Sequence, residues 1–295
     1  MPKGATDAGH AFTVERRNDK VIAVRFLEDV VEGWEQWCLL RADAHADHPD
    51  SDRGLQKAHL EEARERGAPI FDFGDFFCAM QNAHDPRASH DALRAEHMRK
   101  DYLNSLVESV VEQCAPYANL WALWAQGNHE TGIVKHHGFD LTKDVARRMQ
   151  TEHSGIGFSG GYRGWVQFMF KVRQSASFQK KLFYTHGRGG RAPATKGVAK
   201  TARRAAYLPD ADIVVSGHIH TDFRVMLARL CLSNQGVESV GEQLHVQLPS
   251  YKPSSFLDTS SWESIHEMPP EPIGAAWLIF KYRHGKMHID ALRAA

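Results

Sequence analysis

Two histidines follow an apolar run in the C-terminal third of the chain. Residues 212–216 lead to Gly217, and His218 and His220 then stand two positions apart. Side chains two apart on an extended chain point to the same side. Both imidazoles can therefore be presented together at the end of a buried strand, which is a typical way to build part of a metal site.

Four further polar clusters follow apolar runs in the same manner. A lone histidine or Gly-Asp pair after a strand is usually a hydrogen-bonded loop residue or a turn. Together, however, the clusters lie at the carboxyl ends of predicted strands, where open α/β sheets gather their sites. In chain order the five are Asp43-x-His45, Gly74-Asp75, Gly127-Asn128-His129-Glu130, His186-Gly187 and Gly217-His218-x-His220.

The elements that must position these clusters differ between the two halves of the chain. The first half alternates strands and helices, which favours parallel strands joined by crossover helices. We predict strands at residues 21–26, 37–42, 69–73 and 120–125, and helices at 53–66, 92–114 and 141–153. The second half is predicted to be β-rich, with strands near 165–172, 181–185, 213–216, 223–230, 245–248, 275–282 and 287–290 and a short helix before 213.

No linker separates the two halves. We therefore expect a loose segment over residues 1–19 and a single domain over residues 20–295, of α/β (α+β) class.

Composition excludes some classes of function. The chain has 295 residues, with 36 basic and 36 acidic side chains, so any contact with nucleic acid would need a local basic patch. The four cysteines contain no C-x-x-C pair and are expected to be reduced thiols. Without a signal peptide or a bilayer-spanning apolar stretch, a cytoplasmic location and no membrane partner are expected.

The five clusters, in this order over residues 40–221, resemble the calcineurin-like metallophosphoesterase superfamily. The resemblance implies a four-layer α/β/β/α sandwich with its metal site at the C-terminal ends of strands. It implies two divalent metal ions, Mn²⁺ first, with Fe, Zn²⁺ or Mg²⁺ as alternatives. The implied ligands are Asp43, His45 and His220 for the first ion, Asn128, His186 and His218 for the second, and Asp75 as the bridge.

The same resemblance implies the hydrolysis of phosphate esters. A metal-bound hydroxide would attack phosphorus, and His129 would act as general acid or transition-state stabiliser. Because His129 adjoins the ligand Asn128, its side chain is expected to leave the metal side and point toward the substrate. The alternative is a histidine beside the site without a direct part in the chemistry.

The sequence departs from the superfamily's common pattern in the first cluster, which lacks the common glycine after its histidine, and in the second. Many members continue the second cluster as G-D-x-x-D-R-G, but here Cys78 stands where the second aspartate would be. This departure argues against a Ser/Thr protein phosphatase and leaves the partner that orients His129 open between Asp72 and Glu130. Asp47 either touches the site or, as we prefer, caps the following turn. The closest likeness is to small members encoded by phages and prophages.

A basic segment over residues 188–204 is the candidate for recognising the substrate. It contains no acidic residue, and its cations are Arg188, Arg191, Lys196, Lys200, Arg203 and Arg204. It is either a phosphate-binding rim, for example for a nucleic-acid backbone, or an ordinary solvated face. Arg188 and Arg191 lie nearest to His186 and are the better candidates for substrate binding.

These features favour phosphodiester or nucleic-acid substrates, with a phosphomonoesterase acting on nucleotides or small phosphate esters as the second hypothesis. A non-catalytic protein-binding scaffold would be expected to have lost ligands or His129, and this chain retains them. The oligomeric state is left open.

Overall fold

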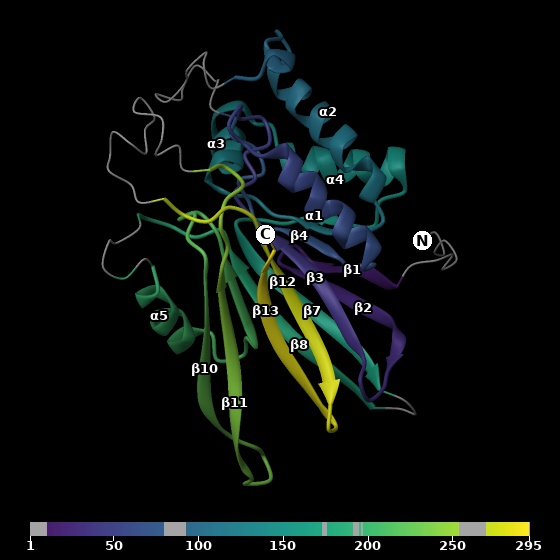
Figure 1. Ribbon diagram of the computed structural model, residues 1–295, viewed down its shortest axis with the longest axis vertical. Helices are drawn as coiled ribbons and strands as arrows, with labels where there is room; N and C mark the ends of the chain where they lie inside the picture. The colour runs from purple at the N-terminus through teal and green to yellow at the C-terminus, as the bar shows by residue number, and fades with distance from the viewer. Residues whose placement is uncertain are drawn as a thin grey trace.

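The computed structural model describes residues 11–79, 93–172, 176–190, 195, 197–253 and 270–294. Two mixed β-sheets are stacked on one another, and helices lie on their outer sides (Figure 1). The predicted α/β class with two sheets and flanking helices is therefore confirmed.

The six-stranded sheet carries the first three candidate clusters. Its central strands run parallel, and two antiparallel strands from the C-terminus complete it. The order along the sheet is β13 (Lys286–Ala294), β12 (Ala275–Arg283), β3 (Glu35–Arg41), β4 (Ile70–Asp72), β5 (Trp121–Trp124) and β6 (Phe158–Ser159). Because β3, β4 and β5 are parallel, the loops that follow them leave the sheet at the same edge.

The seven-stranded sheet carries the remaining two clusters. Strand β9 pairs in parallel with both β8 and β11, while the other pairs are antiparallel except for β2 with β7. The order is β1 (Phe12–Asn18), β2 (Val21–Val30), β7 (Arg163–Val172), β8 (Ala176–Thr185), β9 (Ile213–Ser216), β11 (Glu238–Gln247) and β10 (Phe223–Leu232).

The helices are distributed unevenly between the two outer faces. Helices α1, α2 and α4 lie over the six-stranded sheet, whereas α5 stands beside the other sheet (Figure 1). A small apolar cluster of Phe183, Val214 and Leu208 lies at the outer face next to α5. The helices are α1 (Arg53–Glu65), α2 (Tyr102–Cys114), α3 (Asn128–His137), α4 (Leu141–His153) and α5 (Ala199–Tyr207), with short 3₁₀ turns η2 (Ala95–His97) and η3 (Ala115–Tyr117).

Aromatic side chains fill the space between the sheets. The ring centroid of Phe168, on the seven-stranded sheet, lies 5.6 Å from that of Phe71 and 4.8 Å from that of Phe280, both on the six-stranded sheet. Phe26 likewise lies 6.3 Å from Phe280. Aromatic contacts of this kind dominate core energetics, so one apolar core fixes the two sheets relative to each other.

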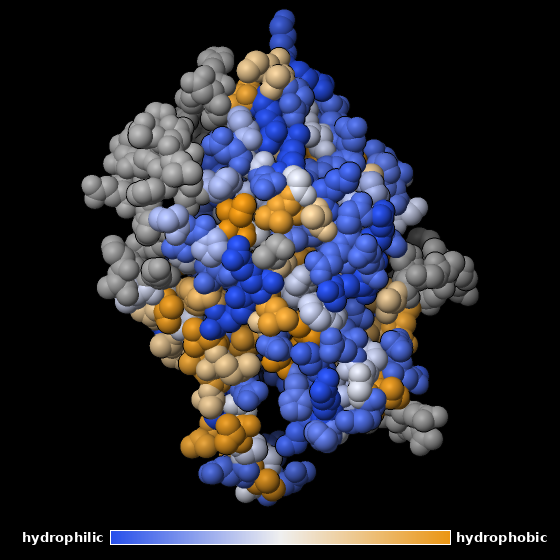
Figure 2. Space-filling model, in the orientation of Figure 1, coloured by the Kyte–Doolittle hydropathy of each residue, from blue (hydrophilic) through white to orange (hydrophobic). Residues whose placement is uncertain are grey.

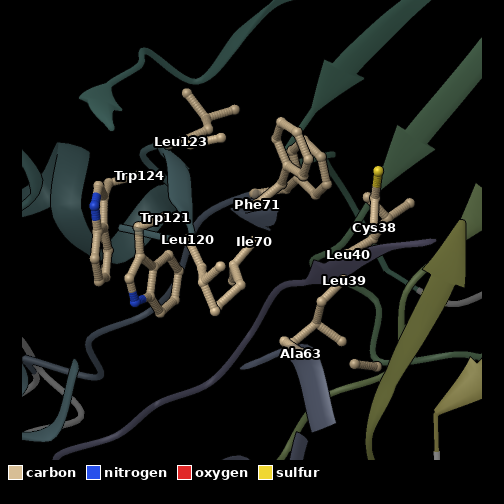
Figure 3. Close-up of a cluster of buried hydrophobic side chains, with 14 of the residues drawn as sticks. Cys38, Leu39, Leu40, Ala63, Ile70, Phe71, Leu120, Trp121, Leu123 and Trp124 are labelled. Carbon is tan, nitrogen blue, oxygen red and sulfur yellow. The ribbon is translucent and has the colours of Figure 1, made fainter. Parts of the chain in front are cut away.

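A buried ion pair lies on the helix-facing side of the six-stranded sheet. Arg41 is 0% exposed and donates to Asp72 at 3.2 Å, with its guanidinium also over the Trp121 ring. Figure 3 shows the indole of Trp121 stacked beside that of Trp124 in this layer. Burial raises the pKa of Asp72 to about 7 even though Arg41 opposes the shift. The other Asp72 oxygen accepts the N–H of Gly74 at 3.0 Å, which ties the ion pair to the second candidate cluster.

Three expectations about the elements are wrong. Residues 12–18 are not loose, because they form β1 at the sheet edge, paired antiparallel with β2. The helix expected over residues 92–114 begins only at Tyr102, after the short turn η2. Helix α3, which starts at Asn128 inside the third cluster, was not expected at all.

The β10–β11 hairpin is longer than expected and extends away from the body of the molecule (Figure 1). One face of it exposes apolar side chains, visible as an orange patch at the bottom of Figure 2. These side chains are Met226, Leu230, Leu232, Val237 and Val240.

Other expectations concern the thiols and the membrane. Cys38, Cys78 and Cys114 are buried, Cys231 is partly buried, and all four are thiols outside any disulfide, as expected. Of the helices in the described ranges, none has the length and apolar character needed to cross a bilayer.

The buried histidine His245 allows a prediction about acid stability. Burial, together with the charges of Arg204 and Arg229, lowers the pKa of His245 to about 4. Because the folded pKa lies below the unfolded value of about 6.5, this contribution to stability is present above pH 6.5 and is lost as pH falls toward 4. We expect the unfolding free energy of the wild type to fall relative to that of His245→Gln between pH 7.5 and 5 in urea titrations. A difference that stays constant over this range would contradict the assignment.

Candidate metal centre

The loops after five strands meet at one place and hydrogen-bond to one another. Asp43 N–H donates to Gly74 O at 2.9 Å, and His45 N–H donates to Asp75 O at 3.1 Å. His218 N–H donates to the Asp43 carboxylate at 2.8 Å, which joins the loops of the two sheets. The candidate clusters are therefore held against each other by backbone donors as well as by the strands that precede them.

Five of the seven candidate ligands have left-handed backbone conformations. Only a few per cent of non-glycine residues have positive φ, and each such residue costs on the order of 1 kcal/mol or more. The residues and angles are Asp43 (52°), His45 (43°), Asp75 (55°), His218 (74°) and His220 (54°). Such strain clusters at functional sites, because the surrounding structure holds the side chains in one arrangement.

Two of the glycines in these clusters are required by close packing. A Cβ at Gly127 would lie 2.1 Å from the Asp75 carboxylate, and a Cβ at Gly74 would lie 2.5 Å from Gly127 N. Both distances are far inside van der Waals contact, so the second and third clusters can approach each other only with glycine at these positions.

Within the described parts of the chain, acidic and histidine side chains form three overlapping groups that could hold metal ions. Within each group the ligand atoms lie within 4.8 Å of one another. The groups are Asp43, His45 and His220; His45, Asp75 and His129; and Asp75, His186 and His218. Because His45 and Asp75 each belong to two groups, the three groups form one continuous row.

Asn128 joins the third group through its amide oxygen. Its Oδ1 lies 2.7 Å from His218 Nδ1 and 3.2 Å from His186 Nε2. His186 Nε2 also lies 3.0 Å from Asp75 Oδ2. The structure thus places Asp43, His45 and His220 together on one side, and Asn128, His186 and His218 together on the other, with Asp75 next to the second set.

The charges at the site fit a bound cation. Asp43 is 0% exposed, and no hydrogen-bond donor among the described residues reaches its Oδ1, although His220 Nε2 lies 3.4 Å away. Although burial opposes it, the charges of Asp75 and Asp43 raise the pKa of His186 to about 10. A proton on His186 therefore partly compensates two buried carboxylates, and a divalent ion would do so more completely.

Each of these histidines turns one ring nitrogen toward the site, and on His186 a bound ion would replace the proton at Nε2. His186 Nδ1 donates to the Phe73 carbonyl at 3.0 Å, which leaves Nε2 to face Asp75 and Asn128. This is the usual outer hydrogen bond of a metal-ligating histidine. Burial, followed by the charge of His129, lowers the pKa of His45, and burial followed by His186 lowers that of His218. Neutral imidazoles are the form that binds metals.

His129 lies in the middle of the row, which differs from the expectation that its side chain would leave the metal side. Its Nε2 is 3.8 Å from Asp75 Oδ2, and the side chain is 9% exposed. Its Nδ1 is hydrogen-bonded to the Cys78 carbonyl at 2.5 Å. Because a carbonyl can only accept, Nδ1 carries the proton and Nε2 is the nitrogen available to the site.

Neither expected partner orients His129. Asp72 is paired with Arg41, and the buried Glu130 carboxylate accepts three backbone N–H groups instead. These donors are Asp75 at 3.0 Å, Phe77 at 3.0 Å and Gly127 at 2.7 Å. Glu130 therefore holds the second cluster against the start of α3.

Asp47 does not belong to any of the three groups. Its carboxylate accepts the N–H of Cys78 at 2.5 Å and that of Ala79 at 2.9 Å. We expected Asp47 to cap the turn that follows the first cluster. This expectation is wrong, because Asp47 binds the loop of the second cluster instead.

The basic segment is only partly available to a substrate. Lys200 Nζ donates to the Arg188 and Gly190 carbonyls, and Arg204 donates to Ser216 Oγ at 2.6 Å. Arg188 and Arg203 are exposed. Arg191 and Lys196 lie outside the described residues. Lys200, Arg203 and Arg204 therefore do not offer three unengaged cations to a substrate.

Tyr162 is a residue at the site that the sequence did not indicate. Its ring packs edge-on against His186 with 5.5 Å between centroids, and its hydroxyl donates to the Gly187 carbonyl. Burial, together with Asp75 and Asp43, raises its pKa to about 12, so it stays protonated. Nothing in the pattern around Gly160 and Gly161 marked it.

Comparisons with known proteins give fold-level similarity only. No protein-family model and no curated protein sequence matches the chain. Among solved structures, a conserved protein from Streptococcus pneumoniae TIGR4 described as a predicted phosphoesterase matches with 11% identity and a TM-score of 0.32, over 88% of this chain and 91% of that one.

Two further structures are similar to the same degree. Vps29 from Entamoeba histolytica, complexed with Zn²⁺, has 10% identity and a TM-score of 0.34, over 88% of this chain and 100% of that one. The calcineurin-like phosphoesterase YfkN from Bacillus subtilis has 13% identity and a TM-score of 0.35, over 89% of this chain and 91% of that one. At these values the similarities do not indicate what this chain binds, and the geometry of the site is the guide.

The shared position of Asp75 leads to a prediction about metal affinity. Asp75→Asn removes a charge that two of the three groups use, so we expect it to weaken Mn²⁺ binding by tenfold or more, at least as much as losing an outer-shell partner costs. Isothermal titration calorimetry measures this directly. His153→Ala, at the exposed end of α4, is the matched control, because it removes a histidine away from the site. It should bind Mn²⁺ with the affinity of the wild type. Unchanged affinity in Asp75→Asn would count against the site.

Proposed function

We propose that the chain is a dinuclear metal-dependent phosphoesterase of the calcineurin-like metallophosphoesterase superfamily. The observation that carries this proposal is the continuous row of three ligand groups sharing His45 and Asp75. The order of the five clusters along the chain supports the same superfamily. We further propose that it belongs to the small members of the kind encoded by phages, and that it acts in a reducing cytoplasm, in keeping with four cysteines that form no disulfide.

Asp43, His45 and His220 would hold one divalent ion and Asn128, His186 and His218 the other, with Asp75 between them. The mixture of imidazole, carboxylate and amide donors suits Mn²⁺, Fe or Zn²⁺, with Mg²⁺ as an alternative. When bound, the ions would supply an activated water and neutralise the phosphoryl oxygens.

The chain's own groups would then orient the ester and protonate the leaving oxygen. With Nδ1 of His129 fixed on the Cys78 carbonyl, its Nε2 is the nitrogen that can carry a transferable proton. The Asp75 carboxylate lies 3.8 Å from this nitrogen.

The role of His129 can be separated from that of a ligand. His129→Asn should lower kcat on the order of a hundredfold or more if Nε2 donates the proton. Metal content, measured by atomic emission, should be unchanged. Turnover close to that of the wild type would rule out the acid role, and loss of one metal would instead make His129 a ligand in the second group.

The substrate class is proposed as phosphodiesters or nucleic acid, with phosphomonoesters as the second candidate. Support comes from the exposed Arg188 two residues after His186 and from the absence of the protein-phosphatase sequence after Asp75. Lys200 and Arg204 make hydrogen bonds within the protein. Only a short basic edge is therefore left to bind a polyanion. Direct comparison of bis-p-nitrophenyl phosphate, p-nitrophenyl phosphate, cyclic nucleotides and DNA with added Mn²⁺ decides between the two classes.

Arg188 allows a test on the preferred substrate. Arg188→Ala removes an exposed cation two residues after His186, while the carbonyl at position 188 can still accept from Lys200. We expect KM for the diester to rise severalfold with kcat nearly unchanged, because the charge binds ground state and transition state alike. Arg203→Ala, an exposed arginine on α5, is the matched control. Equal effects of the two variants would show that Arg188 has no specific part.

A non-catalytic scaffold is the alternative of another class. One similar structure, from Plasmodium, is described as an anchor in the inner membrane complex. The complete ligand set and the strained backbone at five of its members favour an enzyme, since a scaffold has no use for either. Bound metal without turnover on any ester in the comparison above would support the scaffold.

A further inference from the structure

We propose that Asp47 is a positioning residue for His129 and acts through the peptide group between Cys78 and Ala79. This inference rests on the proposed phosphoesterase function, in which His129 is the proton donor. Asp47 would thus replace the orienting aspartate of the common pattern, at whose position this sequence has Cys78.

One peptide group connects the two side chains. The Asp47 carboxylate accepts the N–H of Ala79 at 2.9 Å, and the carbonyl of the same peptide, that of Cys78, accepts from His129 Nδ1 at 2.5 Å. The result is a chain of hydrogen bonds from carboxylate through peptide to imidazole. Each bond in such a chain polarises the next, so the negative charge of Asp47 strengthens the carbonyl as an acceptor.

The second Asp47 oxygen fixes the direction of this peptide. It accepts the N–H of Cys78 at 2.5 Å, so the two oxygens hold two successive amides. Asp47 itself is 5% exposed, which keeps water from competing for these bonds. Bonds from a carboxylate to amide N–H groups are among the stronger ones in proteins.

The local backbone requires such support. Ala79 has a φ of 47°, a left-handed conformation that is unfavourable for alanine. Glu130 holds the N-terminal part of this loop through Asp75 and Phe77, but it does not reach Cys78 or Ala79. Without Asp47 the 78–79 peptide loses the carboxylate that holds its N–H, and the acceptor that fixes the ring and the tautomer of His129 is less firmly placed.

Asp47 is not a member of the metal-binding groups. None of the three groups of potential ligands in the described residues contains it, and both of its oxygens bind backbone amides. A variant at this position should therefore change the proton donor and leave metal binding intact. That separation distinguishes positioning from a ligand role.

The first test is kinetic. Asp47→Ala should lower kcat roughly tenfold to a hundredfold, as misplacing a catalytic group does, with KM and Mn²⁺ stoichiometry unchanged. The loss should be larger for phenyl than for p-nitrophenyl esters, because the poorer leaving group depends more on the acid. Asp47→Asn keeps one oxygen that can accept from a backbone amide, so its kcat should lie between those of the wild type and Asp47→Ala. Asp52→Ala, which removes a carboxylate that caps α1 through Leu55 N–H, is the matched control and should leave the ester ratio unchanged.

The second test asks whether Asp47 acts through His129. In the His129→Asn background, adding Asp47→Ala should cost no further activity, because the group it positions is already absent. An additive loss, or wild-type kcat in a folded Asp47→Ala protein, would overturn the proposal.

The third test needs no substrate. In metal-free protein with ¹⁵N-labelled histidine, long-range proton–nitrogen spectra should show His129 protonated at Nδ1 in the wild type and a mixture of tautomers in Asp47→Asn. Identical spectra would overturn the positioning role. Because this readout does not depend on turnover, failure of the phosphoesterase proposal and failure of the positioning proposal can be told apart.

Discussion

Two buried carboxylates that converge on one row of histidines are the constraint on which this structure depends. Asp43 is fully buried, and Asp75 lies 3.0 Å from His186 Nε2 in equally dry surroundings. Charged groups in such a place are costly unless they are paired with cations or with several donors. The pKa of His186 is raised by the charges of Asp75 and Asp43, which shows that these carboxylates favour a positive charge beside them. A metal centre meets this demand with residues that already face one another.

The rest of the fold can be understood as support for that arrangement. Each sheet supplies part of the site from parallel strand ends, and the aromatic core locks the sheets together. Below the second cluster, the Arg41–Asp72 pair fixes the turn at Gly74. Around the site, backbone donors and buried carboxylates hold loops whose φ angles are unfavourable in isolation. The strain is maintained because many independent bonds oppose its release.

Much of the site could be predicted from the sequence because each candidate ligand follows a local apolar run. Asp43, Asn128 and His218 are each recognisable from a few neighbouring residues, and the strands before them are short and apolar. The parallel strand order then brings their ends together without further information.

The orientation of His129 could not be predicted, because its partner is a main-chain carbonyl 51 positions away. Its place depends on Asp47 and Glu130, whose targets are backbone amides that leave no pattern in the sequence. Strand β1 was missed for a related reason. Residues 15–18 of this edge strand are exposed and polar, so alternation gave no signal. Helix α3 was missed because its first turn is also the third ligand cluster.

The most direct measurement of the central claim is anomalous diffraction from crystals grown with Mn²⁺. The account predicts two manganese peaks about 3.5–4 Å apart, one beside Asp43, His45 and His220 and the other beside Asn128, His186 and His218. The Asp75 carboxylate should lie between them. No manganese among these residues, or a single ion bound away from Asp75, would contradict the account.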